Sequence, residues 1–164
     1  MKRIVLICST SAFSIACSND KGGEEATAEV AILGTWDATA LKIDDATASE
    51  DAKNGRDALA YMTAKECYVI TFNFKQDLTV IAENSVDYLE INITATGLDI
   101  PCPTEKDTDS STYTFDGKTL AIVDVQGKLV NTNASIVGNI LNIDAAGLGI
   151  PNFNGTGQLI FQKR

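Results

Sequence analysis

The side chains available for chemistry in this sequence are thiols, carboxylates, amines and phenols, because its 164 residues include no histidine. Without an imidazole, the relays that activate a serine or cysteine nucleophile are missing, and so are histidine metal sites. Any catalysis would have to use carboxylates, lysine or tyrosine, and the sequence also contains four cysteines. We therefore expect a protein that is not an enzyme and needs no cofactor, and the cysteines are the first residues to explain.

Residues 1–16 have the three-part arrangement of an export signal. Two basic residues follow the initial Met, an uncharged and mostly apolar stretch runs from Ile4, and the small Ala16 precedes the point of cleavage. The apolar stretch is shorter than the roughly 20 residues that span a bilayer as a helix. Residues 1–16 are therefore expected to be a signal peptide, and Cys17 to begin the mature chain.

The segment Ser14-Ile15-Ala16-Cys17 resembles the lipobox of bacterial lipoproteins. Ile15 and Ala16 fit that pattern, whereas Ser14 stands where the family usually has leucine or another aliphatic residue. The resemblance implies that Cys17 carries fatty-acyl chains such as palmitate. At roughly 0.8 kcal/mol per buried CH₂, several chains anchor a protein to a membrane without a spanning helix. The alternative is plain secretion, with Cys17 a stray residue of the signal.

An acidic stretch with two glycines follows, and we interpret residues 17–30 as a flexible tether before a domain of residues 31–164. The stretch resembles the signals that send lipoproteins to the cell surface in the Bacteroidota, so we expect an outer-membrane lipoprotein facing the periplasm or the surface. Cleavage removes two of the 13 basic residues and none of the 22 acidic ones. A surface this acidic repels nucleic acid.

With Cys8 in the signal and Cys17 acylated, Cys67 and Cys102 remain as a pair in an oxidising compartment. A disulfide between them closes a loop of about 36 residues and stabilises the fold by roughly 3–4 kcal/mol on the chain-entropy model. The alternative is a metal site, but two thiols without a histidine are poor ligands. We predict a structural disulfide.

The rest of the chain reads as short strands separated by turn signals. Residues 67–74 alternate most clearly, with large apolar side chains on one face. Residues 44–66 are rich in Ala, Asp, Glu and Lys, and because Gly55 interrupts them we expect a short helix only over residues 57–65. The expected strands cover residues 32–41, 67–74, 78–82, 86–95, 111–115, 119–125, 128–133, 140–144 and 158–162.

Strands joined by short hairpins form a meander whose two edges need protection, and closure into a barrel removes both edges. We therefore expect an all-β, up-and-down, eight-stranded antiparallel barrel with one short helix, and a monomer. An open sandwich is the alternative.

Short motifs support the barrel. They are Leu33-Gly34-Thr35-Trp36, a cysteine before Thr71-Phe72, a second cysteine before Tyr113-Thr114-Phe115, and a closing Leu159-Ile160-Phe161. Together they resemble the lipocalin-like domains of Bacteroidota lipoproteins, over about residues 30–164. The resemblance implies a barrel whose cavity takes small apolar molecules. It also implies that Trp36 lies near the closed end under a basic residue of the last strand, Lys163 or Arg164.

A ligand cavity would be lined by the aromatic and aliphatic faces of the strands, with Ala38 and Ala40 leaving space beside the tryptophan. An eight-stranded barrel is also narrow enough to be filled by its own side chains, which is the alternative. The candidate lining residues are Trp36, Tyr68, Ile70, Phe72, Tyr88, Tyr113 and Phe115.

Residues 91–101 recur as residues 141–151, and each copy ends in Gly-Leu-x-Ile-Pro. Two such loops at one end of a barrel would set Leu98, Ile100, Leu148 and Ile150 around its mouth, where exposed apolar side chains mark a binding surface. In the alternative, these residues fold inward and cap the core.

The carboxylates of Glu105, Asp107 and Asp109 alternate like part of a calcium loop but lack its glycine and closing glutamate. We expect a solvated loop there and no metal site. The sequence as a whole favours a membrane-anchored lipoprotein that binds or carries a small hydrophobic ligand. The alternative is a filled acidic barrel that acts as an interaction or inhibitor module for a basic protein.

Overall fold

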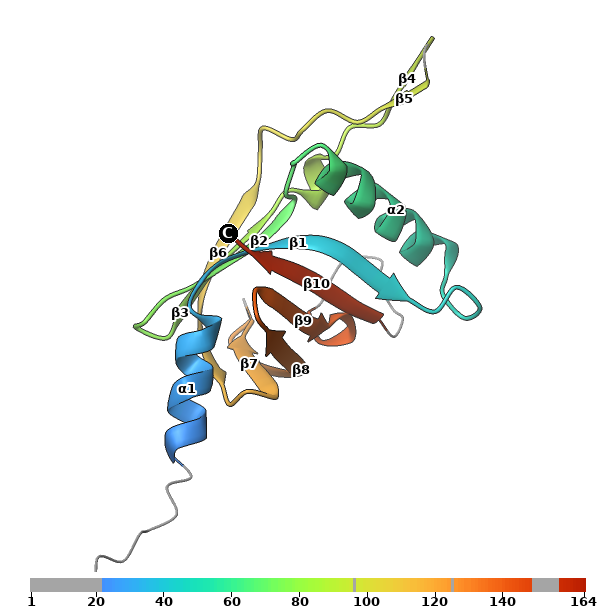
Figure 1. Cartoon of the computed structure of the whole chain (residues 1–164). Helices are drawn as coiled ribbons and strands as arrows, with labels where there is room; N and C mark the ends of the chain where they lie inside the picture. The colour runs from blue at the N-terminus through green and yellow to red at the C-terminus, as the bar shows by residue number, and fades with distance from the viewer. Residues whose placement is uncertain (1–21, 96, 125, 149–156) are drawn as a thin grey trace, which may run out of the picture.

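The computed structural model describes residues 22–95, 97–124, 126–148 and 157–164. Eight antiparallel strands form a closed barrel in the order β1-β10-β9-β8-β7-β6-β3-β2, and two further strands form a separate ribbon (Figure 1). The barrel strands are β1 (Gly34–Ile43), β2 (Ile70–Phe74), β3 (Thr79–Asn84), β6 (Asp107–Phe115), β7 (Thr119–Val123), β8 (Leu129–Val137), β9 (Ile140–Asp144) and β10 (Gly157–Lys163). The predicted all-β barrel is therefore confirmed.

Strand register places alternate side chains inside the barrel, and the large ones gather at one end. Trp36, Phe74 and Phe161 are almost completely buried there. The Phe72 ring stacks on Phe161 with centroids 5.2 Å apart, and Phe74 meets Tyr113 edge-on at 4.9 Å. This aromatic packing fills the end of the barrel at which β1 begins, which we call the closed end.

A β-bulge in β1 changes which of its residues face the core. The pairing with β10 shifts between Ala38 and Ala40, so that Leu41 rather than Ala40 returns to the interior. Leu41 is 8% exposed. The expectation that Ala40 leaves space beside Trp36 is therefore wrong, because one extra residue reverses the alternation beyond it.

The first described segment is a helix, α1 (Gly22–Ile32), and not the irregular tether expected up to residue 30. It lies at the closed end beside β6 (Figure 1). Ile32 is fully buried, and Ala28 packs against the core. Helices of this length gain most of their stability from tertiary packing, which the sequence alone does not reveal.

The second helix, α2 (Glu50–Ala64), is longer than the predicted 57–65. Ser49 caps its N-terminus by accepting a hydrogen bond from the Ala52 amide at 3.2 Å, and two acidic residues occupy its first turn. Gly55 does not interrupt it, because this glycine lies in open space and costs only its propensity. Leu59 and Met62 bury the face of α2 that packs on β1.

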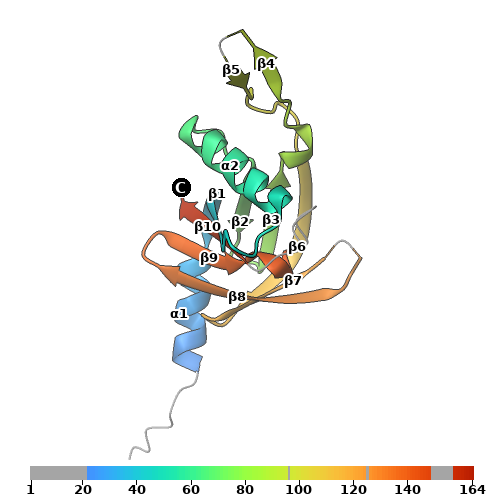
Figure 2. The same ribbon diagram turned by 90° about the vertical axis from the view of Figure 1, so that its right-hand side faces the viewer.

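The prediction of one strand over residues 86–95 is wrong. β3 ends at Asn84, whose side chain accepts a hydrogen bond from the Val86 amide at 3.0 Å, and a 3₁₀ turn, η1 (Val86–Tyr88), follows. Strands β4 (Asn92–Thr94) and β5 (Gly97–Asp99) then pair with each other and project from the barrel (Figure 2). They have no place in the barrel because β6 pairs directly with β3.

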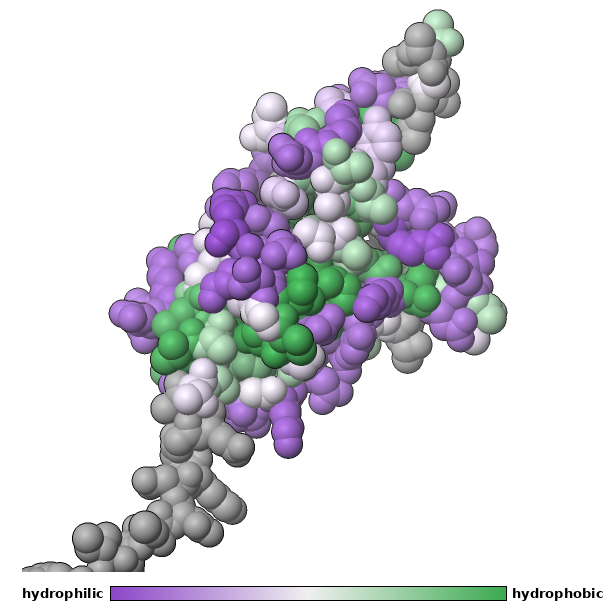
Figure 3. Space-filling view, in the orientation of Figure 1, coloured by the Kyte–Doolittle hydropathy of each residue, from purple (hydrophilic) through white to green (hydrophobic). Residues whose placement is uncertain are grey.

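Cys67 and Cys102 form the predicted disulfide, with their Cα atoms 5.8 Å apart. Cys67 follows α2, and Cys102 follows the ribbon of β4 and β5. The disulfide therefore links the two ends of the segment between Cys67 and Cys102, which contains β2, β3 and the ribbon. On the face seen in Figure 3, hydrophilic residues gather around the start of α2, whereas hydrophobic residues gather on the barrel wall next to α1.

Candidate functional site

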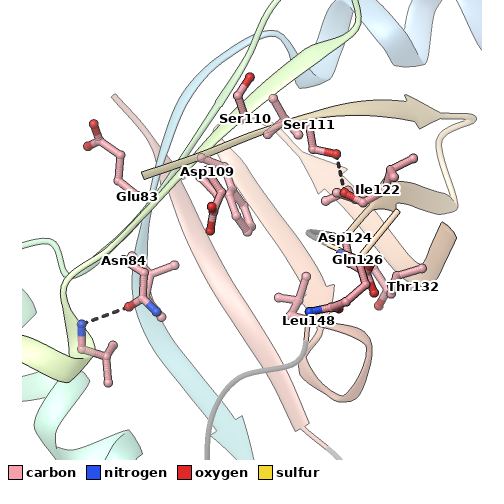
Figure 4. A pocket seen from close by; sticks show the side chains of 17 residues that line it. Glu83, Asn84, Asp109, Ser110, Ser111, Ile122, Asp124, Gln126, Thr132 and Leu148 are labelled. Atoms are coloured by element: carbon pink, nitrogen blue, oxygen red, sulfur yellow. Dashed lines mark hydrogen bonds between the residues drawn. The ribbon is translucent and has the colours of Figure 1, made fainter. Parts of the chain in front are cut away.

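The half of the barrel away from the closed end contains a cavity of about 490 Å³. Its walls come from β3 and β6 on one side and from β7 and β8 on the other (Figure 4). The apolar lining residues are Ile70, Phe72, Val80, Ala82, Val86, Ile122, Val123, Val130 and Leu148. The polar lining residues are Glu83, Asn84, Asp109, Ser110, Ser111, Asp124, Gln126 and Thr132.

The cavity exists because two neighbouring strands separate. β6 pairs with β7 only over Tyr113–Phe115, whereas residues 107–112 of β6 pair with β3 alone. Where the two strands part, the Ser111 hydroxyl donates a hydrogen bond to the Val123 carbonyl and replaces a backbone contact. The barrel is therefore closed at its aromatic end and widened beside β6 and β7.

Register decides which side chains face the cavity. Phe72 lies opposite Ala82, and Ala82 lies opposite Asp109, so these three side chains share the interior face of β2, β3 and β6. Across the cavity, Ile122 of β7 lies opposite Val130 of β8. The floor is apolar, and polar groups occur toward the rim, as is typical of sites for small molecules.

Three carboxylates belong to the lining, and they have different surroundings. Glu83 forms an ion pair with Lys106 at 2.7 Å and points away from the cavity (Figure 4). Asp124 accepts hydrogen bonds from the backbone amides of Gln126 (2.9 Å) and Lys128 (2.8 Å), which shape the turn after β7. Asp109 lies on the interior face of its strand.

The predicted lining residues fall into three groups. Ile70 and Phe72 line the cavity. Trp36, Tyr113 and Phe115 are buried in the packed closed end and do not line it, because the strands carry them below its floor.

Tyr68 and Tyr88 lie outside the cavity. Tyr68 is 41% exposed and precedes β2, which begins only at Ile70. Tyr88 belongs to η1 and donates a hydrogen bond to Asp107 at 2.9 Å, and this bond to a carboxylate raises the pKa of the phenol. Both had been expected on strands, and neither residue is in one.

Trp36 has the environment that the lipocalin resemblance implies. Its Nε1 donates a hydrogen bond to the Ile32 carbonyl at 2.6 Å, and the Lys163 ammonium lies 5.1 Å from the ring centroid. Gly34 has φ +113°, and a Cβ there would lie 3.2 Å from the Lys163 side chain. The glycine of the Gly-x-Trp motif is therefore required both by its backbone angle and by the approach of Lys163.

Tyr113 has a structural role at the closed end. Its hydroxyl donates a hydrogen bond to the Lys75 carbonyl at 3.0 Å, and burial raises the pKa of the phenol. The bond joins β6 to the turn between β2 and β3.

The proposed mouth residues are not equivalent. Leu148 lines the cavity, whereas Ile100 is 4% exposed and folds inward against the core. The Leu98 side chain and Ile150 lie outside the described part of the structure. The two copies of the repeated segment also adopt different structures, since Asn92–Thr94 and Gly97–Asp99 pair in the projecting ribbon and Ile140–Asp144 form barrel strand β9.

Asp109 was missed as a cavity residue because residues 105–109 were expected to form a solvated loop. They instead lead into β6, which begins at Asp107. The alternation of the carboxylates is the alternation of that strand. Extending the series of buried positions Phe115 and Tyr113 backwards in steps of two residues reaches Ser111 and then Asp109. The strand alternation is therefore visible in the sequence, but residues 105–109 include no apolar side chain, so the pattern did not indicate a strand.

Cys17 lies outside the described residues. No helix within the described ranges is long and apolar enough to cross a membrane. Within the same ranges, no group of three or more Cys, Asp or Glu side chains is placed to hold a metal ion.

A scan against protein-family models finds no match to this chain, and a search of curated proteins finds no significantly similar sequence.

Proposed function

We propose that this chain is an acyl-anchored lipoprotein, and not an enzyme, whose barrel holds a small hydrophobic ligand. The observation that carries the proposal is the cavity of about 490 Å³ in the widened half of the barrel. Its size falls within the roughly 300–1,000 Å³ of small-molecule sites, and its floor is apolar. A filled barrel would leave no such space.

The position of α1 gives the orientation that an anchored chain would have. α1 joins β1 at the closed end, where Lys163 also donates a hydrogen bond to the Ala31 carbonyl at 3.2 Å. The cavity lies among the opposite ends of the strands, near Ile70, Asn84 and Asp109. Acyl chains on Cys17 would thus hold the closed end toward the membrane and leave the cavity facing away from it.

Native mass spectrometry of the protein from its own cells, with the acyl anchor cleaved off, tests the ligand. We expect a reproducible extra mass that is lost on unfolding and identifies an apolar compound. Ala82→Trp, which fills the cavity, should abolish it. Ala121→Trp on the outward face of β7 is the matched control and should retain it.

A clean apo mass, with no uptake of apolar fluorescent probes, would contradict the ligand-binding proposal. The alternative function, binding of a basic protein by the acidic surface, would then be favoured. Such binding weakens steeply as ionic strength rises, whereas filling of an apolar cavity does not.

Anchoring has its own test. Metabolic labelling with palmitate should mark the wild-type protein and sediment it with membranes, and Cys17→Ala should lose the label and the membrane association. Cys67→Ala is the control cysteine variant and should remain labelled. A Cys17→Ala protein that still carries the label would refute acylation at this position.

A further inference from the structure

We propose that the cavity selects amphiphiles whose polar end is a cation or a neutral hydrogen-bond donor, and that Asp109 binds this end. The inference rests on the ligand-binding function proposed above and names the class of ligand. It excludes fatty acids and other amphiphiles with an anionic end.

The charged side chains that line the cavity have one sign. Three of the described lining residues carry a carboxylate, and no lysine or arginine is among them. The whole chain is also acidic, with a net charge of −9. A cleft lined by charges of one sign concentrates the field of the protein and attracts ligands of the opposite sign.

Asp109 is the carboxylate that is available to a ligand. Glu83 is neutralised by Lys106, and Asp124 is engaged by the amides of its own turn. Within the described residues, no hydrogen bond or ion pair joins the Asp109 carboxylate to the protein. An ionised carboxylate only accepts hydrogen bonds, so its natural partner is an ammonium, hydroxyl or amide group.

The position of Asp109 fits an amphiphile rather than a free ion. Its side chain lies on the interior face beside Ala82 and Phe72 and hangs into the cavity, opposite Ile122 and Leu148 (Figure 4). A ligand with its apolar body on Phe72 and Ile122 would bring its polar end to Asp109 at the rim. An anionic end in that place would face a carboxylate of like charge.

Three fluorescent probes with the same dansyl group and undecyl chain, ending in an ammonium, a hydroxyl or a carboxylate group, test the selection. The protein is the mature chain from Cys17 with Cys17→Ala, which keeps every described residue. We expect the ammonium probe to bind at least tenfold more tightly than the carboxylate probe, with the hydroxyl probe between them. The difference should shrink in high salt, because Asp109 is exposed to solvent at the rim.

Asp109→Asn removes the charge and keeps the shape of the side chain. It should weaken the ammonium probe, strengthen the carboxylate probe and reduce their ratio to below threefold. Asp51→Asn, on α2 and away from the cavity lining, changes the net charge equally and should leave the ratio as it is. This control separates a local contact from the general acidity of the chain.

The outcomes distinguish this inference from the function on which it rests. If the hydroxyl probe binds and Ala82→Trp blocks it, but the carboxylate probe binds as tightly as the ammonium probe, the cavity function stands and the selection is refuted. An ammonium preference that survives Asp109→Asn also refutes the role of Asp109. If none of the probes binds, the ligand-binding function fails and the selection with it.

Discussion

The ammonium nitrogen of Lys163 lies 5.1 Å from the centre of the Trp36 ring and 3.2 Å from the Ala31 carbonyl at the end of α1. The last barrel strand is thereby linked both to the first strand and to the helix that precedes it. Cations favour the face of an indole ring and the C-terminal end of a helix for electrostatic reasons.

Lys163→Ala should lower the free energy of unfolding by about 1 kcal/mol, because it removes both contacts. Urea unfolding followed by the fluorescence of Trp36, the single tryptophan, measures the loss. Lys42→Ala, on an exposed position of β1, is the matched control and should change stability little. Equal losses in the two variants would show that the contact with Trp36 contributes nothing.

Asp37 and Arg164 should respond unequally to substitution. The Asp37 side chain is only 5% exposed, accepts two hydrogen bonds from Arg164 (2.7 and 3.0 Å) and one from the Thr71 hydroxyl at 2.8 Å. Arg164→Ala leaves a buried carboxylate short of partners and should cost about 2 kcal/mol. Asp37→Asn keeps one oxygen that can accept from both Thr71 and Arg164 and loses only the acceptor for the Arg164 Nε–H group. The guanidinium that loses this partner is well exposed, so the substitution should cost less. Urea unfolding of both variants gives the order, and the reverse order would contradict it.

The disulfide should contribute strongly to stability. Replacing both Cys67 and Cys102 by Ser should lower the free energy of unfolding by roughly 3–4 kcal/mol, because the open loop gains conformational freedom in the unfolded chain. Adding a reductant to the wild-type protein should lower its urea unfolding midpoint to that of the double variant. The same reductant should leave the midpoint of the double variant unchanged. A reductant effect on the double variant would show that another cysteine is responsible.

Asp116 should make stability depend on pH at the turn between β6 and β7. Hydrogen bonds from the backbone amides of Thr119 (2.6 Å) and Lys118 (2.8 Å) lower the pKa of Asp116 below its ordinary value of 3.8. A carboxyl group with a lowered pKa stabilises the fold above its unfolded pKa, and this contribution is lost as the pH falls through the folded pKa.

The stability of wild type relative to Asp116→Asn should therefore be greatest at neutral pH and decline below about pH 4. Unfolding in urea at pH 7, 5 and 3 measures this decline. Glu90→Gln, at an exposed position outside the helices and strands, serves as the charge control. A difference between wild type and Asp116→Asn that stays constant across these pH values would mean that the Asp116 charge has no part in the turn.

Hydrophobic alternation was a sound guide wherever a strand has one face in the packed core. It placed Ile70 and Phe72 together on the inner face of β2 and located the hairpins on either side of β7. It failed for residues 86–95, where alternation is also present but the chain leaves the barrel after Asn84. Alternation within a strand predicts which of its faces is buried, but it does not predict which other strand pairs with it.

The sequence by itself determined an all-β fold of hairpin-joined strands and the Cys67–Cys102 pair, because alternation and thiol pairing are local or compositional constraints. The structure decided that Lys163, rather than Arg164, lies over Trp36 and that Gly34 has the positive φ that admits it. Only the tertiary structure decided that half of the interior is filled and half is open. The cavity arises where β6 leaves β7 at Tyr113, and Asp109 faces it because β6 extends beyond that point beside β3 alone. The separation of β6 from β7 depends on which distant segments pair with each other. No single residue of the sequence specifies that pairing.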